Sequence, residues 1–286
     1  MIYLFLCIIS STLIFTVFKI AGNNKLDNYA LITINYLVAS ALGFSLGGFP
    51  TDLHMPAGWY KMAITIGILF ILIFIVMAVT TQKSGMAVST IASKMSVVVP
   101  ITFSIIYFSE RLTLFKIFAI ILALTAVLLT IYKKQSAMKW KSSAFLLPIV
   151  LFLGSGTIDS MVKYSQEVYV GSNDSILFSS ILFLIAAVSG LIILLFRWKR
   201  SSLKLSLRLL FAGFVLGIIN FGSLYGLINA LESNIFESSI LFGINNIGIV
   251  MLSVLIAVIF FREKLLTINK IGIILSIIAI LLLSYV

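Results

Sequence analysis

The chain has 286 residues, of which 61% are hydrophobic and 10% are charged, and its mean hydropathy is +1.21. Soluble domains have roughly 45–50% apolar and about 25% charged residues, so this composition excludes a water-soluble protein and predicts many transmembrane helices. The formal net charge of +11 does not indicate a nucleic-acid partner, because the basic residues lie in short segments between apolar runs.

Ten apolar runs are long enough to cross roughly 30 Å of hydrocarbon at about 1.5 Å per residue. Short segments such as Gly22-Asn23-Asn24, with typical turn residues, separate them. These connections leave no room for a separate soluble domain. In chain order, the predicted helices cover residues 2–21, 30–48, 60–81, 85–108, 114–132, 144–163, 175–196, 208–229, 236–261 and 267–285.

The basic residues predict the orientation of these helices. The first basic residues, Lys19 and Lys25, follow the first apolar run instead of preceding it. That order is the reverse of a cleavable signal peptide, so a retained helix is expected. Fifteen of the 20 lysines and arginines lie in alternate loops, four lie on the opposite side and Lys94 lies within the membrane. The positive-inside rule then predicts an inner or plasma membrane protein with both termini outside the cytoplasm.

Residue matches between the two halves predict a duplicated unit, with repeats at 1–138 and 139–286. Each unit has five helices, an odd number, so the second copy would be inverted in the membrane. Inverted repeats with a site at the midplane are the architecture of secondary transporters. The expected fold class is therefore an all-α membrane protein of ten helices in two inverted repeats. The matched pairs are Ser11 with Ser155, Lys19 with Lys163, Glu110 with Glu263 and Leu112 with Leu265.

Both halves carry a Glu-x-Leu turn between their fourth and fifth helices: Ser109-Glu110-Arg111-Leu112-Thr113, and Arg262-Glu263-Lys264-Leu265. With the duplication and the helix count, these turns resemble the drug/metabolite transporter superfamily, and within it the EamA-type ten-helix carriers. The resemblance covers essentially the whole chain. It implies a secondary carrier for a small organic metabolite or drug. Because the superfamily's substrates include amino acids, nucleotide sugars and sugar phosphates, it does not name the cargo.

Lys94 lies near the middle of the fourth predicted helix, where an ammonium group costs about 2.5–3.5 kcal/mol even on a lenient scale. Ser93 lies on the same polar face, and the corresponding helix of the second half carries Asn245 and Asn246 at a similar depth. Neither polar face can be turned to lipid, so a shared polar cavity is expected. Lys94 would bind an anionic group of the cargo or carry a proton; the structural alternative is an ion pair or hydrogen bonds to helix ends.

The remaining polar side chains have both functional and structural interpretations. Asn245, Asn246 and Asn220 suit hydrogen bonding to a cargo, although asparagine also fastens membrane helices together. Asp159 is a candidate for proton coupling or a partner of Lys94, but it could also neutralise Lys163 one turn away. Glu237 is a second proton-coupling candidate with a capping alternative. The predicted substrate-binding residues are Lys94, Ser93, Asn245, Asn246 and Asn220.

The turn residues Glu110, Leu112, Glu263 and Leu265 are interpreted as structural. Each glutamate is expected to accept backbone N–H bonds from the helix that follows its turn.

Other functional classes find less support. His54 is the chain's single histidine, so no metal site is expected, and the sequence shows no cofactor motif, ATPase signature or catalytic constellation. We therefore expect a carrier and not an enzyme, moving a small, anionic or zwitterionic molecule such as an amino acid. Its expected partners are this cargo, the lipid bilayer and, as a hypothesis, protons; a monomer and a homodimer both remain open.

Two alternative functions remain open. A lipid-linked-sugar flippase predicts a cavity that opens sideways to the bilayer. A membrane scaffold without transport predicts a closed bundle in which Lys94 and Asp159 form a saturated pair.

Overall fold

The computed structural model describes residues 1–48, 56–107, 113–132, 142–169, 175–198, 206–233, 235 and 238–284. All regular secondary structure in these ranges is helical, and the helix bounds confirm the predicted runs to within a few residues. The helices are α1 (Ile2–Asn23), α2 (Asn28–Gly47), α3 (Ala57–Lys83), α4 (Met86–Met95), α5 (Val98–Tyr107), α6 (Leu114–Ile131), α7 (Ser142–Val168), α8 (Ser175–Trp198), α9 (Leu207–Glu232), α10 (Ser238–Ile259) and α11 (Thr267–Ser284).

These helices form a multi-pass membrane protein. Within the described ranges, nine segments are long and apolar enough to cross a bilayer, with α4 and α5 counted together as Met86–Tyr107, and a shorter apolar helix covers Thr267–Leu283. The boundary expected between the repeats, at 138/139, lies outside the described residues. We define the basic end of the bundle as the end at which α1, α3 and α10 finish.

The fourth span differs from the expected continuous helix, because it breaks between α4 and α5. Pro100 has no backbone N–H and therefore cannot bond to the carbonyl oxygen of Ser96, four residues earlier. The N–H of Val99 takes that oxygen instead, at 2.9 Å. The hydroxyl of Ser96 in turn donates to the carbonyl oxygen of Ser93 at 2.5 Å. The break therefore follows directly after Ser93 and Lys94.

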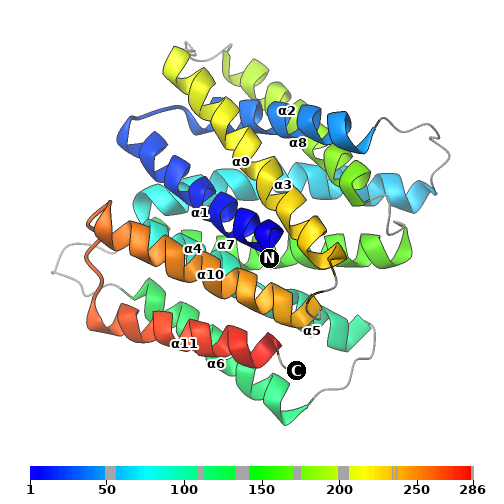
Figure 1. Ribbon diagram of the computed structural model, residues 1–286. Coiled ribbons are helices and arrows are strands. Elements are labelled where there is room, and N and C mark those ends of the chain that lie inside the picture. The colour runs from blue at the N-terminus through cyan, green and yellow to red at the C-terminus, as the bar shows by residue number, and fades with distance from the viewer. Residues whose placement is uncertain are drawn as a thin grey trace.

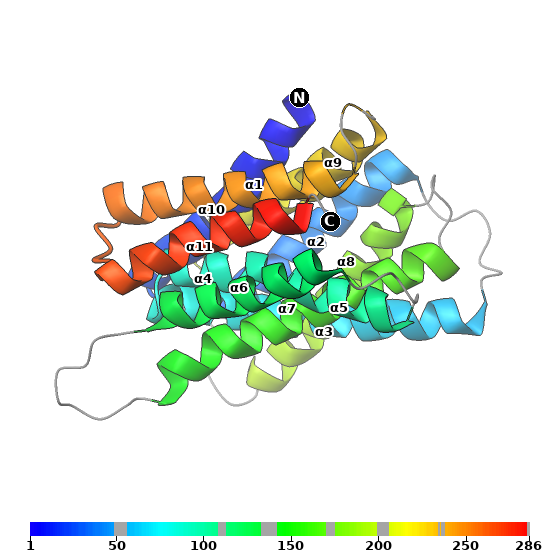
Figure 2. The same ribbon diagram turned by 90° about the horizontal axis from the view of Figure 1, so that it is seen from below.

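The two halves of the chain interlock instead of packing as separate bodies. The most extensive helix contacts join α2 with α8, α6 with α11, and α1 with α9, each pair taking one helix from either half. In Figure 1, α6 and α11 form one edge of the bundle and α2, α8 and α9 the other, with α1, α4 and α10 between them. Figure 2 shows the same bundle from below, with α10 and α11 in one layer and α3, α6 and α7 in the other.

The crossing of α1 and α9 depends on a glycine. A Cβ on Gly226 would lie 2.8 Å from the carbonyl oxygen of Tyr3 and 2.9 Å from the backbone nitrogen of Cys7. Both contacts are with backbone atoms, which cannot turn away as a side chain can. One turn earlier, a Cβ on Gly222 would meet only the hydroxyl of Ser10, at 3.3 Å.

Replacing Gly226 by alanine is therefore expected to destabilise the bundle by about 1–3 kcal/mol, because α1 and α9 must move apart. The matched variant Gly222→Ala should be neutral or stabilising, since alanine favours a helix by about 1 kcal/mol over glycine. Thermal unfolding of both purified variants in detergent tests this contrast. Equal melting temperatures would contradict the close backbone approach.

The α6–α11 edge is held by a buried amide. The side-chain nitrogen of Asn269 donates to the carbonyl oxygens of Leu129, Thr130 and Tyr132 at 3.1, 2.9 and 2.7 Å. Its oxygen accepts from the N–H of Leu266 at 3.0 Å. One residue therefore satisfies both the last carbonyl groups of α6 and the chain entering α11.

We expect Asn269→Ala to lower the free energy of unfolding by about 1–3 kcal/mol, because it leaves buried backbone groups without partners. Asn24→Ala is the control, since its exposed amide reaches a single carbonyl oxygen, that of Ile20, at 2.9 Å. The comparison is again made by thermal unfolding. A melting temperature for Asn269→Ala no lower than that of the control would show that this amide does not hold the edge.

Candidate functional site

The helix that carries Lys94 has no face toward lipid. Eight of the ten residues of α4 are buried, and α1, α3, α6, α7, α10 and α11 all contact it. The two exceptions are Ser93 and Lys94, which are partly exposed. Because other helices surround α4, this exposure indicates an opening inside the bundle and not contact with lipid.

The Lys94 ammonium group forms neither a hydrogen bond nor an ion pair with any residue that the structure describes. Its charged neighbour is Asp159 on α7, which interacts with it electrostatically, as does the Cys7 thiol of α1. The Ser96 side chain, at the break after α4, lies beside the Asp159 carboxylate. Two opposite charges thus face the same region without being joined in an ion pair.

Asp159 is exposed although it lies on the inner face of α7. The lipid-facing residues of this helix, Leu146, Val150, Leu153 and Thr157, recur along one stripe. At about 100° per residue, Asp159 points roughly 200° away from Thr157, to the opposite side. It lies between two contacts of α7, one to α3 through Gly154 and one to the α4–α5 break through Gly156. Its exposure is therefore to the interior opening.

The corresponding face of α10 completes the opening. Ile244, Met251 and Leu255 form the exposed lipid stripe of this helix. Phe242 lies two residues before Ile244, and hence on the other side, yet it is 40% exposed. Asn246, one turn further on, is partly exposed on the same inner face. α10 therefore brings an amide and an aromatic ring to the opening.

Among the described residues, those that face the opening are exposed toward one end of the bundle. Toward the basic end, the inner faces are buried at Met86 and Thr90 of α4, Phe152 and Ser155 of α7, and Ile249 and Ser253 of α10. Toward the opposite end, Lys94 is partly exposed, and Asp159 and Phe242 are exposed. The same change occurs on three helices, so the site around Lys94 is accessible from the end opposite the basic one.

Polar groups of α1, α9 and α10 form a mostly buried cluster, in which Cys7 interacts electrostatically with Lys94. The hydroxyl groups of Ser11 and Ser223 are hydrogen-bonded at 2.6 Å, and the Cys7 thiol is 3.9 Å from Ser11 and 4.0 Å from Ser223. Cys7 also lies beside Asn245. Asn245 is buried, and its Oδ1 atom accepts no hydrogen bond from the described residues. A buried acceptor without a donor is costly in a folded protein, but this atom is enclosed by protein, so a cargo could reach it only after the surrounding helices move.

Several other predicted residues do not face the opening around Lys94 or lie outside the described residues. Asn220 lies against Asn35 of α2. When the Asn35 amide nitrogen faces the carbonyl oxygen of Leu216, at 3.1 Å, the side-chain oxygen of Asn35 accepts a hydrogen bond from the side-chain nitrogen of Asn220 at 3.3 Å. Lys163 does not pair with Asp159 and instead donates to the Ser104 hydroxyl at 2.7 Å. Three predicted residues, Glu237, Glu110 and Leu112, lie outside the described residues.

Glu263 requires a correction. It was expected to accept N–H bonds from the helix after its turn, but it accepts them from α4, at 2.8 Å from Met86 and 3.4 Å from Ala87. Arg262, with a φ of 51°, turns the chain back toward the bundle. Gly85, with a φ of 109°, leaves space for the carboxylate, because a Cβ there would lie 2.9 Å from Oε2. The neighbouring Leu265 packs in the apolar interior.

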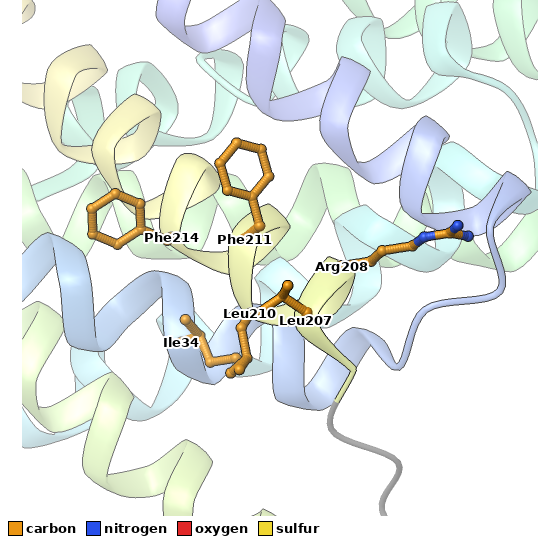
Figure 3. Close-up of a pocket in the computed structure, with 6 residues that line it drawn as sticks. All are labelled: Ile34, Leu207, Arg208, Leu210, Phe211 and Phe214. Carbon is orange, nitrogen blue, oxygen red and sulfur yellow. The ribbon is translucent and has the colours of Figure 1, made fainter.

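A surface groove of about 680 Å³ lies elsewhere, on the outside of the bundle. Figure 3 shows its lining on α9 and α2: Ile34, Leu207, Arg208, Leu210, Phe211 and Phe214. Apart from Arg208 these residues are apolar, and none belongs to the predicted site. A groove of this character suits contact with acyl chains and does not mark the polar site.

Cys7, Ser223 and Phe242 were not predicted as site residues. Cys7 and Ser11 are one turn apart on one face of α1, and this spacing is a sequence signal for a polar face. Phe242 carries no such signal, because phenylalanines occur throughout the apolar helices.

No known protein-family model matches the chain. An uncharacterized protein from Haemophilus influenzae (strain ATCC 51907 / DSM 11121 / KW20 / Rd) is 27% identical over 294 residues, covering 99% of this chain and 97% of that protein. A protein of known crystal structure superposes with a TM-score of 0.64 at 15% identity, over 99% of this chain and 96% of its own. This likeness shows that the fold occurs in an experimentally solved protein.

Proposed function

We propose that the chain is a secondary carrier that moves a small zwitterionic metabolite, such as an amino acid, across an inner or plasma membrane by alternating access. The observation that carries the proposal is the separated pair of charges, Lys94 and Asp159, in an opening that leads to one end of the bundle. An intramembrane charge without a partner is costly, so a ligand that compensates both charges is the simplest reason to keep them.

A zwitterion matches this arrangement group by group. The carboxylate of an amino acid would accept hydrogen bonds from Lys94 and Ser93, and its ammonium group would donate to Asp159. The partly exposed amide of Asn246 offers a further polar contact, and the buried Asn245 would join it only after the surrounding helices move. Phe242 would contact the apolar part of the cargo. Asn220 is not included, because its amide already contacts Asn35.

The helix contacts support an inverted repeat. In the proposed repeat, α1, α2, α3 and α6 correspond to α7, α8, α9 and α11, and α4 with α5 corresponds to α10. The α1–α9 contact then corresponds to the α3–α7 contact, and the α2–α9 contact corresponds to the α3–α8 contact. The α1–α10 contact corresponds to the contacts of α7 with α4 and α5, and each of these contacts is present. The two other major contacts, α2–α8 and α6–α11, join equivalent helices. A two-fold relation between the halves accounts for this pairing.

The alternatives are less well supported. A scaffold was expected to pair Lys94 with Asp159 in a closed bundle, whereas the described residues contain no such ion pair. A flippase was expected to open sideways to lipid, whereas Asp159 is exposed on the face of α7 opposite its lipid stripe. With the basic end in the cytoplasm, as the charge distribution favours, the opening faces outward and both termini are non-cytoplasmic.

The proposal is tested with the purified protein in liposomes. A panel of labelled amino acids is first screened for uptake. The best cargo is then compared with analogues that lack one charge; for leucine these are 4-methylpentanoate and 3-methylbutylamine. We expect uptake of the zwitterion to be inhibited much more strongly by other zwitterions than by either analogue. If no amino acid is taken up, or if both analogues compete as well as zwitterions do, the proposed cargo class is wrong.

A further inference from the structure

Lys19 and Glu263 form a partly buried ion pair at the basic end of the bundle. The Lys19 ammonium group donates to Oε1 of Glu263 at 2.6 Å, and the two side chains are 17% and 12% exposed. The same carboxylate accepts the N–H groups of Met86 and Ala87 at the start of α4. A single side chain from the turn after α10 thus joins the C-terminal part of α1 to the first turn of α4. We call this arrangement the basic-end contact.

An apolar cluster packs around the basic-end contact. Phe15 of α1, Met86 and Ala87 of α4, and Ile249 and Ala257 of α10 form one buried cluster. These are the three helices whose ends the basic-end contact joins. Packing and charge pairing therefore close the bundle at the same place, between Lys94 and the basic end.

The partners in this contact come from different halves of the chain. Lys19 and the amides of Met86 and Ala87 belong to the first half, whereas Glu263 belongs to the second. A carrier that has taken cargo from the opposite end must next open at the basic end. A movement that parts α1 and α4 from the turn after α10 at the basic end breaks every bond that the Glu263 carboxylate makes to α1 and α4.

We propose that Lys19 and Glu263 are positioning residues that hold the carrier in the state open to the opposite end, and that their ion pair separates when the site opens at the basic end. This inference rests on the proposed carrier function. The Glu-x-Leu turn then has a role beyond local turn structure, since its glutamate stabilises one state of the transport cycle.

The experiment measures which end of the bundle gives access to the site. In a Cys7→Ser background, Ser93→Cys supplies one thiol beside Lys94, and a membrane-impermeant maleimide is applied to either side of oriented vesicles. Lys264→Cys at the basic end and Lys61→Cys at the opposite end are exposed standards for sidedness. Melting temperatures of all variants confirm that the protein remains folded.

In the Cys7→Ser, Ser93→Cys protein we expect Lys19→Met and Glu263→Gln each to raise the rate of labelling from the basic end by roughly tenfold or more. Losing one charge-assisted hydrogen bond shifts an equilibrium between two states by about this factor. Lys19→Arg, which keeps the charge, should label as the parent does. Glu263→Gln keeps an oxygen that can accept the α4 amides, so its effect isolates the ion pair from the helix cap.

Arg197→Met is the matched control, because Arg197 pairs with Asp27 at 3.1 Å between α2 and α8, away from α4 and α10. It should leave labelling from the basic end unchanged. An increase in this control equal to that in Lys19→Met, or no increase in either Lys19→Met or Glu263→Gln, would overturn the inference. Because labelling requires no cargo, a shift in labelling without amino-acid uptake would refute the cargo class alone, and uptake without a shift would refute the role of the basic-end contact alone.

Discussion

Replacing Lys94 by methionine is expected to weaken cargo binding by roughly 10- to 100-fold, the equivalent of losing one hydrogen bond to a charged group at about 1.5–3 kcal/mol. The cargo carboxylate loses its cationic partner, while the length of the side chain is nearly kept. Lys94→Arg, which retains the charge, should bind more tightly than Lys94→Met. Competition for the uptake of a labelled amino acid measures the difference, and Lys61→Met, at an exposed position, is the control.

The same substitution separates a binding role from a structural one through the sign of its effect on stability. Because the Lys94 ammonium group has no ion-pair or hydrogen-bond partner in the described part of the chain, its removal should leave the melting temperature unchanged or raise it. In a structural ion pair, removal of one partner would destabilise the bundle by about 3–5 kcal/mol. A lower melting temperature with unchanged binding would contradict the assignment of Lys94 to the cargo.

Asp159→Asn is expected to change which molecules the carrier accepts. Without the carboxylate, the ammonium group of a zwitterion loses its charged partner, whereas a molecule that carries only a carboxylate loses nothing. The preference for an amino acid over its carboxylate analogue should therefore fall by roughly tenfold or more, as expected for the loss of one charge-assisted hydrogen bond. Competition by 4-methylpentanoate against labelled leucine, or the corresponding pair for another cargo, measures this preference.

The same variant tests proton coupling, which we propose through Asp159 because, among the described residues, it is the carboxylate that interacts electrostatically with Lys94. If Asp159 carries the coupled proton, a pH gradient that drives uptake in the parent should have no effect on Asp159→Asn. Glu167→Gln, at an exposed position near the end of α7, is the control on the same helix. An unchanged cargo preference together with an unchanged response to the gradient would exclude Asp159 from the site.

Much of the fold could be predicted from the sequence because membrane helices are defined by apolar length alone. The exception is the fourth span. The sequence shows that Pro100 lacks an N–H group, but only the structure shows the break between α4 and α5 that results. Lys94 itself was recognisable, because a charge at mid-membrane is costly enough to need a reason.

Contacts between distant residues could not be predicted in this way. Lys19 and Glu263 are 244 positions apart, and each taken alone resembles an ordinary helix-end or turn residue. Asn220 gives the same sequence signal as Asn245, an asparagine within an apolar helix, yet it contacts Asn35 of α2. Which polar residue reaches a shared opening depends on how the helices rotate against each other, and hydropathy does not contain that information.

The central claim is that Lys94 faces a water-accessible opening reached from the end opposite the basic loops. The most direct test is the labelling of Ser93→Cys in the Cys7→Ser protein, compared with Thr90→Cys one turn nearer the basic end. We predict that Ser93→Cys reacts with the impermeant maleimide from the opposite end, that cargo slows the reaction, and that Thr90→Cys does not react. A Ser93→Cys thiol as unreactive as Thr90→Cys from both sides would contradict the opening and the carrier mechanism built on it.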